Sequence, residues 1–102
     1  MIKNENLIIQ QGTIKLIKIE IKEIKILIKK MRKDVKATGF IEIERAMEII
    51  FKEFEQNLLP IENAIKIWKF RDATPESVVY ILGAYKTVKE YKQLVMDAYS
   101  QV

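Results

Sequence analysis

The side chains of this sequence that could do chemistry are its cations, and many of them recur at helical spacing in the first third of the chain. On a helix, steps of three, four and seven residues would place these lysines within an arc of about 80°. The lysines are Lys15, Lys18, Lys22, Lys25, Lys29, Lys33 and Lys36. Glu20 and Glu23 would point to the other side, and the row would be roughly 27 Å long. The spacing therefore predicts a positive row with little local neutralisation, which could hold a nucleic-acid backbone without reading bases.

Two further groups of cations extend this candidate interface. A basic cluster thickens the end of the row, and the last third of the chain carries three lysines beside Tyr85. The candidate nucleic-acid-binding residues are Lys15, Lys18, Lys22, Lys25, Lys29, Lys30, Arg32, Lys33, Lys86, Lys89 and Lys92. Two alternatives stay open: a solvated face whose lysine stems cover apolar surface, and a basic helix lying on a membrane surface.

The composition excludes most enzymatic chemistry. The 102 residues include no Cys and no His, which removes thiol nucleophiles, imidazole bases and the common zinc ligands. No glycine-rich phosphate loop is present. Glu44 and Glu48 lie one turn apart, yet no Asp-x-Asp spacing supports a magnesium site around them. We therefore expect a protein that is not an enzyme, with no metal site and no cofactor.

Length and composition indicate one domain. Hydrophobic residues make up 49% of the chain and charged residues 31%, with a net charge of +4. We find no secretory signal and no apolar run of membrane-spanning length, so we expect a soluble cytoplasmic protein without a membrane partner. A break at Gly12 makes residues 1–12 a candidate flexible N-terminal segment.

The segment from Thr13 to about Lys33 has two competing periodicities. Ile17 to Lys22 alternates as a strand would, but the alternation then changes phase. A seven-residue pattern lasts longer and forms a single apolar stripe on a helix. Its members are Ile14, Ile17, Ile21, Ile24, Ile28, Met31 and Val35. We therefore predict an amphipathic helix.

Three further helices are expected. A core face from Phe40 to Leu59 predicts the second helix, which Pro60 should end while opening a third that carries Trp68 in the core. Thr74 and Pro75 form a start signal for the last helix. The core-facing residues expected are Phe40, Ile43, Met47, Ile50, Phe51, Phe54 and Leu58, and then Val78, Ile81, Leu82, Tyr85, Val88, Val95 and Tyr99. The predicted fold is all-α, a single-domain bundle of four to five helices.

Some apolar residues lie outside these core faces and are candidates for a partner interface. They are Ile19, Ile26, Phe70, Tyr80 and Tyr91. Large apolar and aromatic side chains left on a surface suit contacts with other proteins. Gly83, inside the last helix, suggests that another helix approaches closely there.

The last third of the chain also carries a resemblance. The segment Trp68-Lys-Phe-Arg-Asp-Ala-Thr-Pro-Glu-Ser-Val-Val-Tyr-Ile-Leu resembles the small helical subunits of CRISPR interference complexes, and the archaeal type I-A small subunit in particular. The resemblance covers roughly Phe70 to Val102. It implies a non-enzymatic subunit, present in several copies along a guide-RNA complex, that offers basic surface to nucleic acid.

Two hypotheses from different classes follow. The first is a helical subunit of an RNA-guided nucleoprotein complex that binds nucleic-acid backbone and stacks on neighbouring subunits. The second is a homo-oligomeric or partner-binding helical module, or a virus- or plasmid-encoded inhibitor, with no nucleic-acid role. Isoleucine at both heptad positions favours parallel trimers or tetramers, which supports self-association in the second case.

Overall fold

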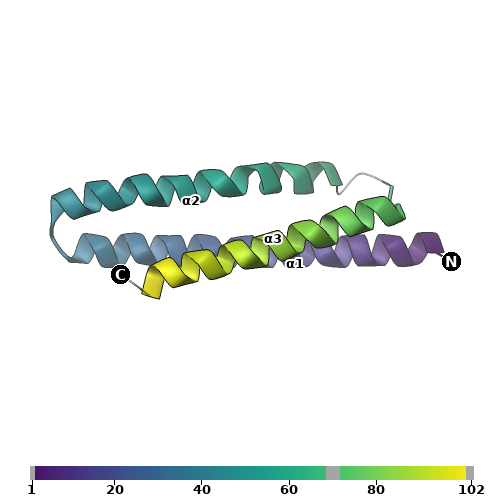
Figure 1. The fold of residues 1–102 in the computed structure, drawn as a ribbon, viewed down its shortest axis with the longest axis horizontal. Coiled ribbons are helices and arrows are strands. Elements are labelled where there is room, and N and C mark those ends of the chain that lie inside the picture. Colours follow the sequence, from purple (N-terminus) through teal and green to yellow (C-terminus); the bar gives the residue numbers. More distant parts are fainter. Residues whose placement is uncertain (1, 69–71, 101–102) are drawn as a thin grey trace.

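The computed structural model describes residues 2–68 and 72–100, and these form three long helices. They are α1 (Ile2–Ala37), α2 (Ile41–Trp68) and α3 (Pro75–Ser100). The chain runs up, down and up again, so that α2 is antiparallel to α1 and α3 runs in the direction of α1 (Figure 1). The molecule is a rod of 59 × 21 × 15 Å. The all-α class is confirmed, with three helices instead of the four to five expected.

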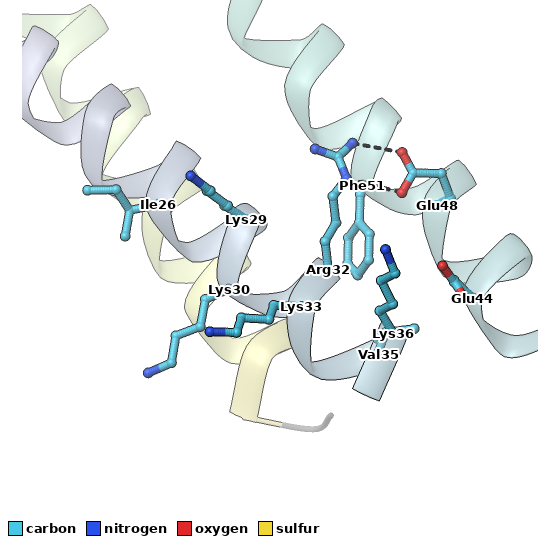
Figure 2. A pocket seen from close by; sticks show the side chains of 10 residues that line it. All are labelled: Ile26, Lys29, Lys30, Arg32, Lys33, Val35, Lys36, Glu44, Glu48 and Phe51. Atoms are coloured by element: carbon cyan, nitrogen blue, oxygen red, sulfur yellow. Dashed lines mark hydrogen bonds and ion pairs between the residues drawn. The ribbon is translucent and has the colours of Figure 1, made fainter. Parts of the chain in front are cut away.

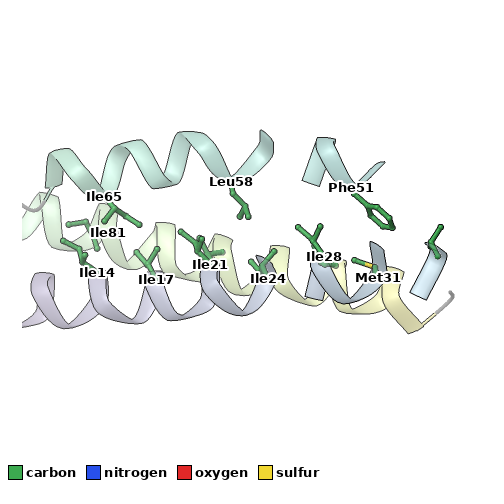
Figure 3. Close-up of a cluster of buried hydrophobic side chains, with 13 residues drawn as sticks. Ile14, Ile17, Ile21, Ile24, Ile28, Met31, Phe51, Leu58, Ile65 and Ile81 are labelled. Carbon is green, nitrogen blue, oxygen red and sulfur yellow. The ribbon is translucent and has the colours of Figure 1, made fainter. Parts of the chain in front are cut away.

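The apolar stripe of α1 is the centre of the core. All seven residues of the predicted heptad pattern are buried, and Ile17 and Ile24 are completely so. They meet Phe51, Leu58 and Ile65 of α2 and a matching heptad row of α3 (Figure 3). The helical prediction for this segment is therefore confirmed, because the stripe is covered by two other helices along its length.

The predicted break at Gly12 is absent, and residues 2–12 continue α1. A glycine inside a helix costs about 1 kcal/mol relative to alanine. Here Gln10 and Thr13 on either side are buried, and the Thr13 hydroxyl donates a 2.6 Å hydrogen bond to the carbonyl of Ile9. Packing of these neighbours outweighs the local preference of the glycine.

The predicted break at Pro60 is also wrong, since α2 continues through it. An interior proline lacks a hydrogen-bond donor and costs about 3 kcal/mol. Pro60 points to solvent, while Leu58 before it and Ile65 after it are buried against α1. Burying those two side chains contributes about 1.5–3 kcal/mol each, which offsets the defect.

The connections between helices follow their sequence signals. Gly39 ends α1 with a positive φ of 77° that glycine adopts without strain. At the start of α3, the Ser77 amide donates to the Thr74 hydroxyl at 3.1 Å, and the Thr74 amide donates to the Ser77 hydroxyl at 2.9 Å. This reciprocal cap confirms the predicted start at Thr74 and Pro75.

A buried glutamine ties the three helices together at one end of the rod. Gln10 on α1 donates through Nε2 to the carbonyl of Trp68 on α2 at 3.2 Å, and its Oε1 accepts from the Ser77 hydroxyl on α3 at 3.0 Å. A polar group in a core seam favours one register, because any slip would leave it without partners. Sequence reasoning missed this residue.

The course of α3 explains which expected core residues are exposed. From a start beside the end of α2, α3 crosses obliquely over α1 and moves away from the first half of α2 (Figure 1). Three apolar residues before and within the first half of α2 are therefore exposed, although the sequence predicted them in the core. They are Phe40, Ile43 and Ile50. Leu82 on α3, also predicted in the core, is exposed as well. The close helix approach expected at Gly83 is wrong within this chain, since a Cβ there would meet nothing within 4 Å.

Replacing Pro60 by alanine tests why α2 continues. We expect Pro60→Ala to raise the free energy of unfolding by about 2 kcal/mol, because it restores a backbone donor inside the helix and removes a steric clash. Chemical denaturation followed by circular dichroism measures this. The control is Pro75→Ala at the first position of α3, where we expect a change within about 0.5 kcal/mol. Equal effects of the two substitutions would contradict this account.

Candidate nucleic-acid interface

The cations at the end of α1 line an open groove between α1 and α2. It measures about 690 Å³ and has an apolar floor that includes Val35 and Phe51. In Figure 2, Arg32 and Lys36 extend from α1 toward α2, and Ile26, Lys29, Lys30 and Lys33 extend to the other side of α1. The lining residues are Ile26, Lys29, Lys30, Arg32, Lys33, Val35, Lys36, Glu44, Glu48 and Phe51. Five cations against two carboxylates make this groove positive.

A second groove continues along the same two helices. It measures about 420 Å³ and is lined by Lys18, Ile21, Lys22, Lys25, Glu62, Ile65 and Lys66. We call the two together the α1–α2 groove. The fold thus brings eight of the nine predicted cations of α1 to one surface, and it adds Lys66 of α2. Lys15, the ninth, is exposed but lines neither groove.

Two of these cations are neutralised by α2, which corrects the expectation of little local neutralisation. Lys25 Nζ lies 3.1 Å from a Glu62 carboxylate oxygen. Arg32 donates from Nε and Nη2 to the two oxygens of Glu48, at 3.0 and 2.9 Å, and also binds Glu55. The hydrogen bonds to Glu55 and Glu48 raise the pKa of Arg32 further above its ordinary value. These pairs hold α2 against α1.

The remaining cations of the groove are available to a ligand. Among the described residues, none forms an ion pair with Lys18, Lys22, Lys29, Lys33 or Lys36. Lys30 Nζ lies 5.4 Å from the centre of the Tyr99 ring, a cation–π contact that leaves its charge in place. Free ammonium groups above an apolar floor attract anions more strongly than the same groups surrounded by water.

The three predicted lysines of α3 do not join this surface. Lys92 binds Glu20, at 3.1 Å, and Glu23, both on the side of α1 away from the groove. Lys89 Nζ lies 5.4 Å from the centre of the Tyr85 ring. Lys86 is exposed on α3. Hydrogen bonds to Glu23 and Glu20 raise the pKa of Lys92, so this lysine is held in place as part of the α1–α3 contact.

The predicted partner residues divide between different surfaces. Ile19 and Ile26 are more than half exposed on the outer side of α1, and Tyr80 is exposed on α3. Tyr91 is partly buried, packs edge-on against Phe54, and donates its hydroxyl to the carbonyl of the same residue at 3.0 Å. Burial raises the pKa of Tyr91. Phe70 lies outside the described residues.

No protein-family model, curated protein or solved structure matches the chain. Within residues 2–68 and 72–100, no helix combines the length and the apolar character that crossing a membrane requires.

Removing the charge of Lys92 tests its structural assignment. We expect Lys92→Gln to lower the free energy of unfolding by about 1 kcal/mol at neutral pH, because Glu20 and Glu23 lose a shared partner at a partly buried site. In the unaltered protein this contribution is present below the ordinary lysine pKa of 10.5 and is lost as the pH rises through the raised value. Denaturant titrations at neutral pH and above pH 10.5 measure both effects. If Lys86→Gln, on the exposed side of α3, destabilised the protein equally, the assignment would be wrong.

Proposed function

We propose that this protein is a non-enzymatic helical subunit that binds the sugar-phosphate backbone of nucleic acid along the α1–α2 groove. The observation that carries the proposal is the row formed by Lys29, Lys33 and Lys36, three cations on successive turns that line the groove and have no partner among the described carboxylates. Lys18 and Lys22 continue the row along the second part of the groove.

The spacing of these lysines suits a phosphate chain. Lys29 and Lys36 are seven residues apart on α1, a rise of about 10 Å. Phosphates of one strand in a duplex follow each other at about 3.4 Å along the axis, so each lysine would serve one or two phosphates. The groove offers no arrangement of side-chain amides that would read base edges. Binding is therefore expected to be independent of sequence and strongly dependent on salt.

A place within a larger RNA-guided assembly is the more specific part of the proposal. It is supported by the resemblance of the segment around Thr74 to small subunits of CRISPR interference complexes, and by the amount of apolar surface on all three helices. Such a subunit would contribute basic surface to nucleic acid and apolar surface to its neighbours.

A partner-binding or homo-oligomeric module without a nucleic-acid role is the second candidate. Its support is the exposure of apolar side chains, such as Leu16, Ile19 and Tyr80, outside the α1–α2 groove. The heptad isoleucines of α1 no longer support it, because α2 and α3 already cover them within one chain. The two candidates differ in a single property, which is binding to nucleic acid at low salt.

Neutralising the free lysines tests the proposal. We expect Lys29→Gln, Lys33→Gln and Lys36→Gln together to weaken binding to DNA and RNA oligonucleotides roughly tenfold or more, by the same factor for unrelated base sequences. The slope of log affinity against log salt should fall by about 2 to 3, because three phosphate contacts are lost. Fluorescence anisotropy over a salt series measures both.

The matched control removes the same number of charges elsewhere. Lys52→Gln, Lys86→Gln and Lys89→Gln together lower the net charge equally but lie outside the α1–α2 groove. We expect this triple variant to keep most of the affinity and most of the salt slope. Equal losses in the two variants would show attraction by net charge alone, and no binding by the unaltered protein at low salt would favour the second candidate.

A further inference from the structure

The outer side of α1 is an apolar ridge that no residue of the described part of the chain covers. It consists of Ile9, Leu16, Ile19 and Ile26, which are between 43% and 56% exposed. Ile19 and Ile26 lie opposite the buried heptad stripe. Ile9 and Leu16 lie between that side and α3, in the heptad row of Glu23 and Lys30, whose side chains contact α3. We call this surface the α1 ridge. It is convex and made of large branched side chains.

On the opposite side of the rod, α2 and α3 leave a concave apolar surface between them. This α2–α3 groove measures about 450 Å³, and its lining includes Ile61, Ala64, Tyr80, Gly83 and Ala84. A Cβ on Gly83 would meet nothing within 4 Å. The groove is therefore open at the position where sequence analysis expected a second helix to approach.

The ridge and the groove lie at the same height along the rod. The hydrogen bonds of Gln10 place it level with Trp68 and Ser77. Since α2 runs antiparallel to α1 and α3 runs in its direction, the first part of the ridge, residues 9–19, is level with the segments that line the groove. A second copy displaced sideways, without rotation, would bring its ridge onto the groove of the first.

Along one edge of each surface the charges are of opposite sign, while Glu20 and Glu23, along the other edge of the ridge, are bound by Lys92 within the chain. Lys15 and Lys22 follow one edge of the α1 ridge. Glu76, Glu90 and Asp97 lie at seven-residue steps from Gly83 on α3, so they follow the edge of the α2–α3 groove, and all three are exposed. Pairing two grooves would bring these carboxylates together, and pairing two ridges would bring the lysines together. A ridge placed in a groove brings opposite charges together.

The exposed surface area of the chain is large enough for two interfaces with other molecules. The chain exposes 7509 Å². A compact monomer of 12.0 kDa would expose about 6,000 Å². The excess of about 1,500 Å² is close to what one molecule loses when it forms two standard interfaces of about 800 Å² each.

We infer that the occupant of the α2–α3 groove is the α1 ridge of a second copy of this chain. Such a contact uses two different surfaces, so a row of copies always has a free ridge at one end and a free groove at the other, and the assembly is open. The inference rests on the proposed role as a subunit of an assembly, but it does not require nucleic acid. Copies related by a sideways shift would also place their α1–α2 grooves in the same orientation.

Two variants that each remove one surface test this arrangement. Leu16→Gln with Ile19→Gln places polar amides on the ridge without changing the net charge, at exposed positions where the fold does not need the apolar side chain. Gly83→Trp fills the groove, at a helical position with open space around it. Circular dichroism first establishes that both variants are folded. Sedimentation velocity over a concentration series then measures assembly in the absence of nucleic acid.

We expect the unaltered protein to form species that grow beyond a dimer as concentration rises, and each variant alone to remain a monomer. An equimolar mixture should form a dimer and stop there, because one variant supplies an intact groove and the other an intact ridge. A monomeric unaltered protein, assembly by either variant alone, or a mixture that stays monomeric would each overturn the inference.

A charge exchange gives a second measurement if the ridge variant does not fold. Lys22 is level with Glu90, so Lys22→Glu should weaken assembly, and mixing this variant with Glu90→Lys should restore a contact. The control Leu59→Asp changes an apolar residue of similar exposure outside both surfaces and should assemble normally.

Nucleic-acid binding is measured separately on the same proteins. The variant with Lys29, Lys33 and Lys36 replaced by glutamine should assemble as the unaltered protein does. Monomers of the ridge and groove variants should keep their affinity for a short oligonucleotide. Loss of assembly with binding intact therefore concerns only this inference, and loss of binding with assembly intact concerns only the proposed function.

Discussion

The buried isoleucine stripe of α1 is the constraint on which the rest of the structure depends. Both other helices pack on it, and each buried aliphatic side chain contributes about 1.5–3 kcal/mol. Because α2 and α3 approach from the same side, α1 must present its remaining surface to solvent. That surface contains the free lysines and the apolar ridge, so both proposed binding surfaces are consequences of how the stripe is covered.

The position of a cation relative to this stripe determines its role. Lys25 and Arg32 lie next to the stripe on the side of α2, where Glu62, Glu55 and Glu48 meet them. Lys18 shares this heptad position but stays available for a ligand, because the residue seven positions after Glu62 is a lysine and not a glutamate. Lys22, Lys29 and Lys33 lie further around the helix and form no ion pair with the described carboxylates. A sequence signal for the pairs does exist, because the three glutamates repeat every seven residues, as do Lys25 and Arg32. This spacing predicts the ion pairs only once it is known that α1 and α2 pack together in antiparallel fashion.

The oblique course of α3 has two opposite effects. It allows Lys92 to bind Glu20 and Glu23 and so fastens α3 to α1. It also separates α3 from the first half of α2, which leaves Ile43 and Ile50 exposed. A rod with one helix covering two others exposes more surface than a compact bundle of the same mass, and much of the additional surface is apolar. The proposed contact between copies would bury part of it.

Sequence alone determined the all-α class, the stripe of α1 and the start of α3 at Thr74, because each depends on local periodicity or on hydrogen bonds within a few residues. It also identified the cations of α1 that line the α1–α2 groove, but not Lys66 of α2. The tertiary structure decided that α1 and α2 continue through Gly12 and Pro60. A local penalty of about 1–3 kcal/mol breaks a helix only when nothing outweighs it, and here the buried neighbours on both sides do so. The tertiary structure likewise decided which lysines are neutralised, since an ion pair needs a carboxylate from another helix, and the sequence of one helix does not contain it.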